Sequence, residues 1–240
     1  QTRDISIVVA AYAPLAMLAA RILKQRGRDL SLIGVSTGYG LPPPTLLPMR
    51  RDFGRFHVTG DLGTGYDGGD ALYVLDVFPN REKENALDLR ERLPLFLAWA
   101  LLRLAPENAR RRVRLALLLP KAGTPWQDAI NAEDETWIRA GADARGALAA
   151  TLTARVLTVL EAWARPATMP AAYFPRAAGA VLAGDDVADA WARERAYAPG
   201  YARLLGRGLD FGPEDPALAA LVAQARRLGE AIGHLVGDAA

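Results

Sequence analysis

Two kinds of hydrophobic pattern divide the chain at about residue 125. Before this point, short apolar or alternating runs bounded by glycine and proline predict β-strands. The strands are expected at residues 5–10, 30–37, 54–62, 71–78 and 113–120. After it, apolar residues recur at helical spacing, which predicts helices at residues 143–164, 185–198 and 215–236. The pattern predicts an α/β core over residues 1–125, followed by a helical extension over residues 126–240 that packs on the core.

Within the core, glycine and proline residues set the expected connections. The glycine-rich segment GTGYDGGD, residues 63–70, separates the strands expected at 54–62 and 71–78, so a β-hairpin is predicted there. The segment GYGLPPPTLLP, residues 38–48, is predicted to be a stiff loop, because a central strand or a helix cannot accommodate its prolines. An apolar helix is expected over residues 86–105.

The apolar N-terminal stretch is predicted to belong to the folded core. Residues 5–20 are too few to span a bilayer, and Pro14 interrupts the run. We expect a strand and then a helix that closes at Gly27. The turn AAYAP after the first strand lacks the glycines of a dinucleotide fold, so a Rossmann-like small-molecule enzyme has no motif to support it.

The amino-acid composition excludes several kinds of functional site. The 240 residues include no cysteine, which excludes disulfides, thiolate metal sites and cysteine nucleophiles. The two histidines, His57 and His234, are far apart in sequence and form no metal-ligand spacing. No cofactor is expected, and a reducing cytoplasm suits such a composition.

Arginine supplies nearly all of the positive charge, although the formal net charge is only +2. The run ARRRVR places Arg110, Arg111 and Arg112 in succession, and arginine forms the better fork for phosphate. These residues are candidate DNA contacts, effective mainly at low salt. Alternatively, they complement the dipole at the end of the preceding helix and are solvated there.

The end of the strand at residues 71–78 carries the main candidate for catalysis. A restriction-endonuclease-like nuclease needs two acidic residues to hold a divalent ion, and a lysine two positions after the second acid to orient water. The strand ends GDLG and LDVF have suitable spacing, but they present Gly63 in place of the first acid and Phe78 in place of the lysine. Asp76 remains, and Asp61 could in principle replace the missing acid. The constellation therefore predicts a degenerate, inactive site, with an active nuclease that uses Asp61 and Asp76 as the alternative.

Three further stretches support a family resemblance. They are LRERLPLFLAWALLRLAP at residues 89–106, VLEAWARPATMPAAYFPRAAGAVLAG at residues 159–184, and AWARERAYAPGYARLLGRG at residues 190–208. In order and character, residues 50–235 resemble the C-terminal domain of RecC, the gamma subunit of exodeoxyribonuclease V. The resemblance implies a restriction-endonuclease-like mixed sheet core whose catalytic residues have been lost. It also implies one domain of a much larger subunit, in keeping with a chain that starts at Gln1.

The resemblance further implies that the domain is a scaffold in a cytoplasmic helicase-nuclease that repairs DNA double-strand breaks. The implied partners are RecB-like and RecD-like subunits and DNA, with no membrane. Aromatic residues are typical interface anchors. We therefore expect Tyr173, Phe174 and Trp191 to lie at or near an exposed apolar surface for another subunit.

Overall fold

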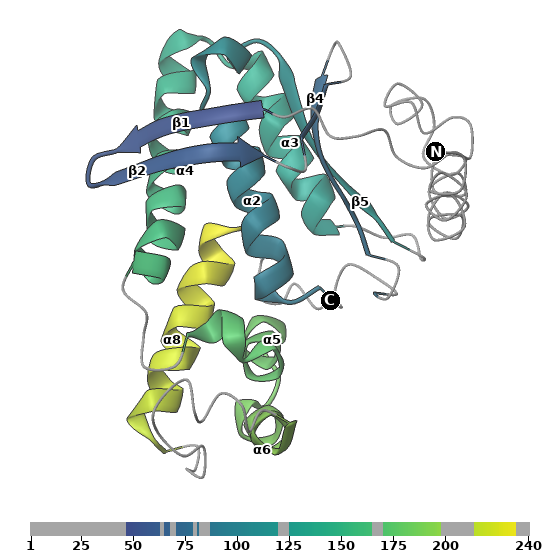
Figure 1. Ribbon diagram of the computed structural model, residues 1–240, viewed down its shortest axis with the longest axis vertical. Helices are drawn as coiled ribbons and strands as arrows, with labels where there is room; N and C mark the ends of the chain where they lie inside the picture. Colours follow the sequence, from purple (N-terminus) through teal and green to yellow (C-terminus); the bar gives the residue numbers. More distant parts are fainter. Residues whose placement is uncertain are drawn as a thin grey trace, which may run out of the picture. The chain divides into compact units, whose positions relative to one another are not determined.

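The computed structural model describes residues 47–62, 65–67, 71–78, 81, 87–119, 125–164, 170–197 and 214–233 (Figure 1). The chain is mixed α/β, which confirms the class predicted from the sequence. The strand, helix and strand expected within residues 5–37 lie outside the described residues. Among the described residues, no helix is both long enough and apolar enough to cross a bilayer.

Strands β1 (Leu47–Phe53) and β2 (Phe56–Leu62) form an antiparallel two-stranded sheet. Their two-residue connection begins at Gly54, whose φ of 63° favours glycine. The predicted hairpin between residues 54–62 and 71–78 is therefore wrong, because residues 56–62 pair with β1 instead. Most of the loop predicted at residues 38–48 lies outside the described residues, and its end at Leu47 and Pro48 belongs to β1, because an edge strand can accommodate a proline.

The second sheet is mixed and has the order β3-β4-β5. Strand β3 (Gly65–Asp67) comes from the glycine-rich segment and pairs antiparallel with β4 (Ala71–Val77). Strand β5 (Arg112–Leu118) pairs parallel with β4 after the crossover helix α2 (Leu89–Arg103). The strand predicted at 71–78, the helix predicted at 86–105 and the strand predicted at 113–120 are confirmed.

Helix α2 begins with reciprocal capping hydrogen bonds. The Asp88 carboxylate accepts from the Glu91 N–H at 3.2 Å, and the Glu91 carboxylate accepts from the Asp88 N–H at 2.9 Å. These bonds satisfy donors that would be unpaired at a helix start. Further along, Trp99 is buried and its Nε1–H donates to the Val113 carbonyl of β5 at 2.9 Å, which fixes α2 against the sheet.

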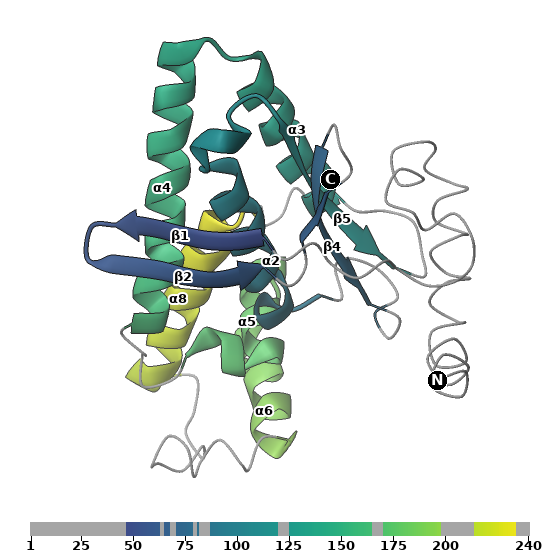
Figure 2. The same cartoon turned by 45° about the horizontal axis from the view of Figure 1, so that its top comes forward.

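Helix α3 (Pro125–Arg139) lies along the outer edge of β5 in both views (Figures 1 and 2). Its polar side chains take the place of a neighbouring strand. Gln127 Oε1 accepts from the Leu117 N–H at 2.7 Å, and Asp134 Oδ2 accepts from the Val113 N–H at 3.2 Å. Between them, Asn131 accepts from the N–H of Leu115 at 2.9 Å and donates to its carbonyl at 3.0 Å.

The seven residues from Gln127 to Asp134 rise about 10 Å along α3, and the four residues from Leu117 back to Val113 span about 13 Å along β5. The lengths of the polar side chains make up the difference, so each can reach its partner on the strand. The helix therefore satisfies an edge that would otherwise expose unpaired backbone groups.

Replacing Asn131 tests this edge bonding. Asn131→Ala removes one acceptor and one donor from Leu115, and we expect it to lower the free energy of unfolding by about 1 to 2 kcal/mol. Asn131 is only partly buried, so water can offset part of the loss. The measurement is urea unfolding followed by circular dichroism. Thr136→Ala is the matched control, since the Thr136 hydroxyl donates only within α3, and it should change stability by less than about 0.5 kcal/mol. Equal effects of the two substitutions would contradict the edge-bonding role.

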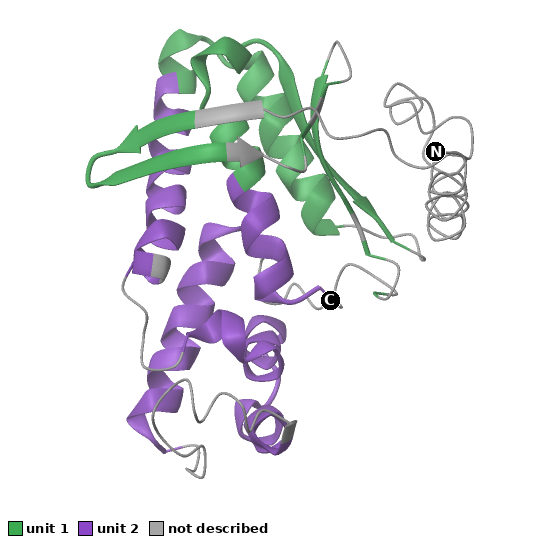
Figure 3. Cartoon of the chain, in the orientation of Figure 1, with its two compact units in different colours: residues 1–86, 98–145 green, residues 87–97, 146–240 purple. Residues whose placement is uncertain are grey.

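The chain has two compact units, each built from two segments (Figure 3). Unit 1 contains residues 1–86 and 98–145, and unit 2 contains residues 87–97 and 146–240. The boundary expected after residue 125 separates β5 from the helices that follow it, whereas the compact units divide the chain elsewhere.

The described secondary structure after residue 125 is entirely helical, as predicted. The remaining α-helices are α4 (Ala142–Ala164), α5 (Pro175–Ala183), α6 (Val187–Tyr197) and α8 (Pro216–Ala231). The Asp215 carboxylate caps α8 by accepting from the Ala217 N–H at 2.8 Å, and Gly184 closes α5 with a φ of 74°.

The core of unit 2 includes polar side chains that bond to buried backbone. Glu194 of α6 accepts from the N–H groups of Arg176 at 2.5 Å and Ala177 at 3.0 Å, at the start of α5. Gln224 of α8 accepts from the Ala171 N–H at 2.6 Å. Helix α5 has no cap from its own N-cap residue, so Glu194 supplies one from a neighbouring helix.

Candidate functional site

Asp76 and Phe78 lie at the C-terminal end of β4, beside β5. Asp76 is half-buried and opposite Leu117 in the parallel register. Phe78 is also half-buried, and its N–H donates to the Leu118 carbonyl at 2.9 Å. The sheet bonding therefore continues through the position at which an active nuclease would carry its lysine. Gly63 lies outside the described residues.

Neither Asp61 nor Asp67 is the partner of Asp76 in the strand register. Asp61 belongs to β2, which pairs with β1 in the other sheet. Asp67 belongs to β3, but it is opposite Leu72, four residues before Asp76, which corresponds to about 13 Å along a strand. The strand that carries Asp61 is therefore not the hairpin partner of β4 that the Asp61 and Asp76 alternative assumed.

A pocket of about 570 Å³ opens between β5 and α3. This volume is within the usual range for small-molecule sites. Its lining includes Arg114, Gln127, Asn131 and Glu135. These polar groups bond to the protein itself: Gln127 and Asn131 hold the edge of β5, and Arg114 forms an ion pair with Glu135. The pocket therefore contains polar side chains that already have partners.

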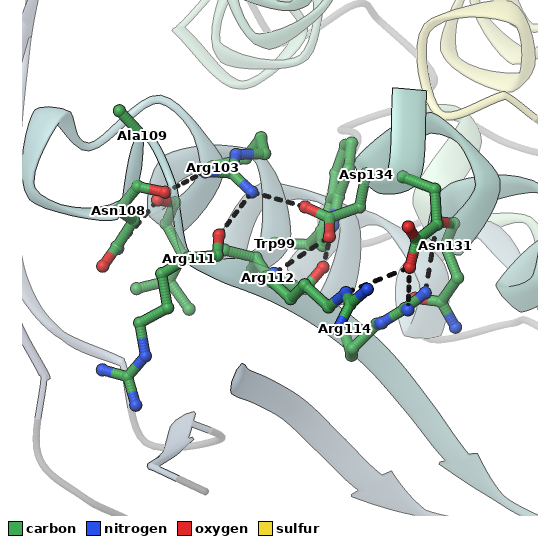
Figure 4. A network of polar contacts seen from close by, with 12 residues as sticks. Trp99, Arg103, Asn108, Ala109, Arg111, Arg112, Arg114, Asn131 and Asp134 are labelled. Atoms are coloured by element: carbon green, nitrogen blue, oxygen red, sulfur yellow. Dashed lines mark hydrogen bonds and ion pairs between the residues drawn. The ribbon is translucent and has the colours of Figure 1, made fainter. Parts of the chain in front are cut away.

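A buried charge network lies beside this edge (Figure 4). Arg103 and Asp134 are fully buried, and Arg103 Nη1 donates to Asp134 Oδ1 at 2.6 Å. The same guanidinium donates to the backbone carbonyls of Asn108 and of Arg111, the latter at 2.8 Å. It also stacks over the Trp137 ring, with its carbon 5.1 Å from the ring centre. One arginine thus connects α2, the turn before β5, and α3.

Burial raises the pKa of Asp134 above its ordinary value, although the hydrogen bond and the charge of Arg103 offset part of this effect.

The helical spacing of the apolar residues in α3 could have indicated from the sequence that Asp134 is buried. Trp126, Ile130 and Trp137 form a buried stripe, and Asp134 lies within the same stripe. No sequence motif, however, marks Asp134 as part of the site.

The predicted DNA contacts differ in their surroundings. Arg111 forms a two-pronged ion pair with Asp67, and Arg112 Nε lies 3.2 Å from Glu135. Arg110 is exposed and has no side-chain partner within the described ranges. All three arginines come after the 3-10 turn η4 (Pro106–Asn108), and Arg112 is the first residue of β5. They are therefore not at the C-terminus of an α-helix, where the alternative placed them to complement the helix dipole.

The predicted interface aromatics are divided between surface and core. Tyr173 is 51% exposed. Phe174 and Trp191 are buried and form an edge-to-face pair, with ring centres 5.6 Å apart. In this structure Phe174 and Trp191 hold α5 and α6 together, which corrects the expectation that they form an exposed apolar surface. Tyr173 remains as the accessible residue of the three.

No family model, no curated protein and no solved structure matches the chain.

Proposed function

We propose that this chain is a catalytically inactive, nuclease-like scaffold domain of a helicase-nuclease subunit that acts in DNA double-strand break repair. The proposal combines the resemblance of residues 50–235 to the C-terminal domain of RecC with the arrangement at the end of β4. The principal observation is that Asp76 is followed at the second position by Phe78, whose N–H is used in bonding to β5. An apolar ring can neither orient a water molecule nor bind a metal ion.

The polar groups beside the sheet give further support. Gln127, Asn131 and Asp134 bond to the backbone of β5, and Arg103 neutralises Asp134. These interactions hold the sheet, the crossover helix and α3 together. They suit a domain that supplies a rigid surface within a larger assembly. In the proposal, that assembly contains RecB-like and RecD-like subunits and works in the cytoplasm.

The first test is cleavage of labelled single-stranded and double-stranded DNA with magnesium or manganese. We expect no product above a no-protein control, and Asp76→Ala should give the same result. Because Asp76 is only half-buried, the substitution should change stability modestly. Metal-dependent cleavage that disappears in Asp76→Ala would refute the inactive assignment and favour an active nuclease.

The second test is association with RecB-like and RecD-like subunits after co-expression. We expect the three chains to elute together in size-exclusion chromatography, and Tyr173→Ala to weaken the association because an exposed aromatic residue commonly anchors an interface. Arg193→Ala, an exposed change on α6, is the control. Separate elution of the wild-type chain would contradict the scaffold role.

A further inference from the structure

Arginines around the turn at residues 109–112 outnumber the carboxylates that contact them. Arg112, Arg114 and Arg139 all contact the single carboxylate of Glu135. A guanidinium has five N–H donors, whereas a carboxylate has two acceptor oxygens. Several donors of these side chains therefore remain available, particularly on Arg139, whose side chain is 80% exposed.

Two more arginines at this turn have no carboxylate partner within the described part of unit 1. Arg110 is exposed and its side chain forms no hydrogen bond or ion pair with the described residues. Arg145, in the first turn of α4, donates from Nη1 to the Ala109 carbonyl at 3.4 Å. This bond brings the start of α4 next to Arg110. Arg112 and Arg139 therefore share Glu135, and Arg145 bonds to the turn that carries Arg110 and Arg112, so the contacts link the four arginines to one part of unit 1.

Several buried donors without an acceptor belong to unit 1. Among the described residues, the following buried nitrogen atoms lack an acceptor: Arg51 Nε, Arg103 Nε, Trp137 Nε1 and Arg145 Nε. Arg103 bonds to the carbonyls of this turn, and Arg51 pairs with Glu107 just before it. On the surface, the exposed guanidinium donors of Arg110, Arg112 and Arg139 also exceed the carboxylate oxygens that they contact, which favours a ligand that brings negatively charged oxygens.

We propose that Arg110, Arg112, Arg139 and Arg145 form a surface that binds the phosphodiester backbone of nucleic acid. The inference rests on the proposed function and gives it a DNA contact face. It retains Arg110 and Arg112 from the sequence prediction and adds two arginines that are distant in sequence. It leaves out Arg111, which Asp67 holds in a two-pronged ion pair.

A nucleic acid fits this surface better than a membrane or an apolar protein partner. Among the side chains that the structure describes, the only large hydrophobic one that is exposed is Tyr173, which belongs to unit 2. Membrane and protein interfaces usually need an apolar centre. Repeated phosphates, in contrast, can engage several separated arginines at once. Such contacts carry no base information, so binding should not depend on sequence.

The test is fluorescence anisotropy with labelled oligonucleotides of about 20 residues, in single-stranded and duplex form. Four phosphate contacts predict a slope of log K against log salt of about −2.8 for single strands and about −3.6 for duplex. For single strands, this is about a 50-fold loss of affinity between 50 and 200 mM salt. The variant with all four arginines changed to alanine should lose this dependence. If it fails to fold by circular dichroism, Arg110→Gln with Arg145→Gln should reduce the slope by about 1.4.

The matched control removes the same charge from exposed positions of unit 2, by changing Arg193, Arg195, Arg226 and Arg227 to alanine. It should bind as the wild-type chain does. Equal loss in the two variants would overturn the proposal, as would the absence of salt-dependent binding by the wild-type chain. Tighter binding to polyglutamate or to anionic vesicles would assign the surface to another partner and also overturn it. Cleavage and subunit association are measured separately, so failure here is distinct from failure of the proposed function.

Discussion

Arg103→Met should lower the free energy of unfolding by about 3 to 5 kcal/mol, the largest effect that we expect from one substitution in unit 1. The reason is burial. Both side chains of the Arg103 and Asp134 pair are inaccessible to solvent, so removal of the arginine leaves an unpaired carboxylate in the interior. It also removes the donor for the carbonyls of Asn108 and Arg111. Urea unfolding followed by tryptophan fluorescence measures the loss, because Trp99, Trp126 and Trp137 all lie in unit 1.

A double-mutant cycle separates the pair from its individual members. Asp134→Leu should cost a similar amount, because it leaves Arg103 buried without its carboxylate. The double variant Arg103→Met with Asp134→Leu should lose much less than the sum of the two single losses, since neither charge is then left unpaired. Arg193→Ala, which breaks an exposed contact of 4.0 Å with Asp189, is the control and should cost less than about 1 kcal/mol. Additive losses in the double variant would show that the two residues do not act as a pair.

Local patterns predicted the elements of this fold more accurately than their pairing. The periodicity at 86–105 and the apolar run at 113–120 correspond to α2 and β5. A strand pattern does not identify its partner, however, and residues 56–62 pair with β1 rather than β4. The two-residue connection that starts at Gly54 is shorter than the glycine-rich segment that the pattern predicts as the hairpin turn, and Pro48 argues against the strand before it.

The site depended on contacts that sequence spacing does not contain. Asp67 is 44 residues from Arg111, and Asp134 is 31 residues from Arg103. Composition therefore identified the arginines but could not show which of them form ion pairs. Residue type was equally uninformative about exposure, because an aromatic side chain suits both a core and an interface. Phe174 and Trp191 form part of the core, while the adjacent Tyr173 is exposed.

Glu194→Ala should lower the free energy of unfolding of unit 2 by about 3 kcal/mol. Glu194 is 4% exposed, and its carboxylate accepts from the N–H groups of Arg176 and Ala177 at the start of α5. Without it, two donors at a buried helix start lose their acceptor, at a cost of about 1 to 3 kcal/mol each, which partial hydration reduces. Hydrogen exchange of α5 and α6 measures the loss, and exchange in β5 of unit 1 serves as an internal reference. Asp189→Asn, an exposed change on the same helix, should have an effect below about 0.5 kcal/mol.

The pH dependence of Glu194→Gln gives a second, independent result. Burial raises the pKa of Glu194, and the hydrogen bonds from Ala177 and Arg176 offset this only in part. The folded protein therefore holds the carboxyl proton more tightly than the unfolded chain does. The resulting contribution to the free energy of unfolding is fully present below the ordinary glutamate pKa of about 4.3. It is lost as the pH rises through the higher pKa of the folded state. Glutamine keeps an acceptor oxygen but cannot titrate, so the stability of wild type relative to Glu194→Gln should fall as the pH increases from about 4 to 7. Unfolding measured across this range should show that decline, and a rise instead would mean that the two helix N–H groups stabilise the ionised carboxylate more than burial penalises it.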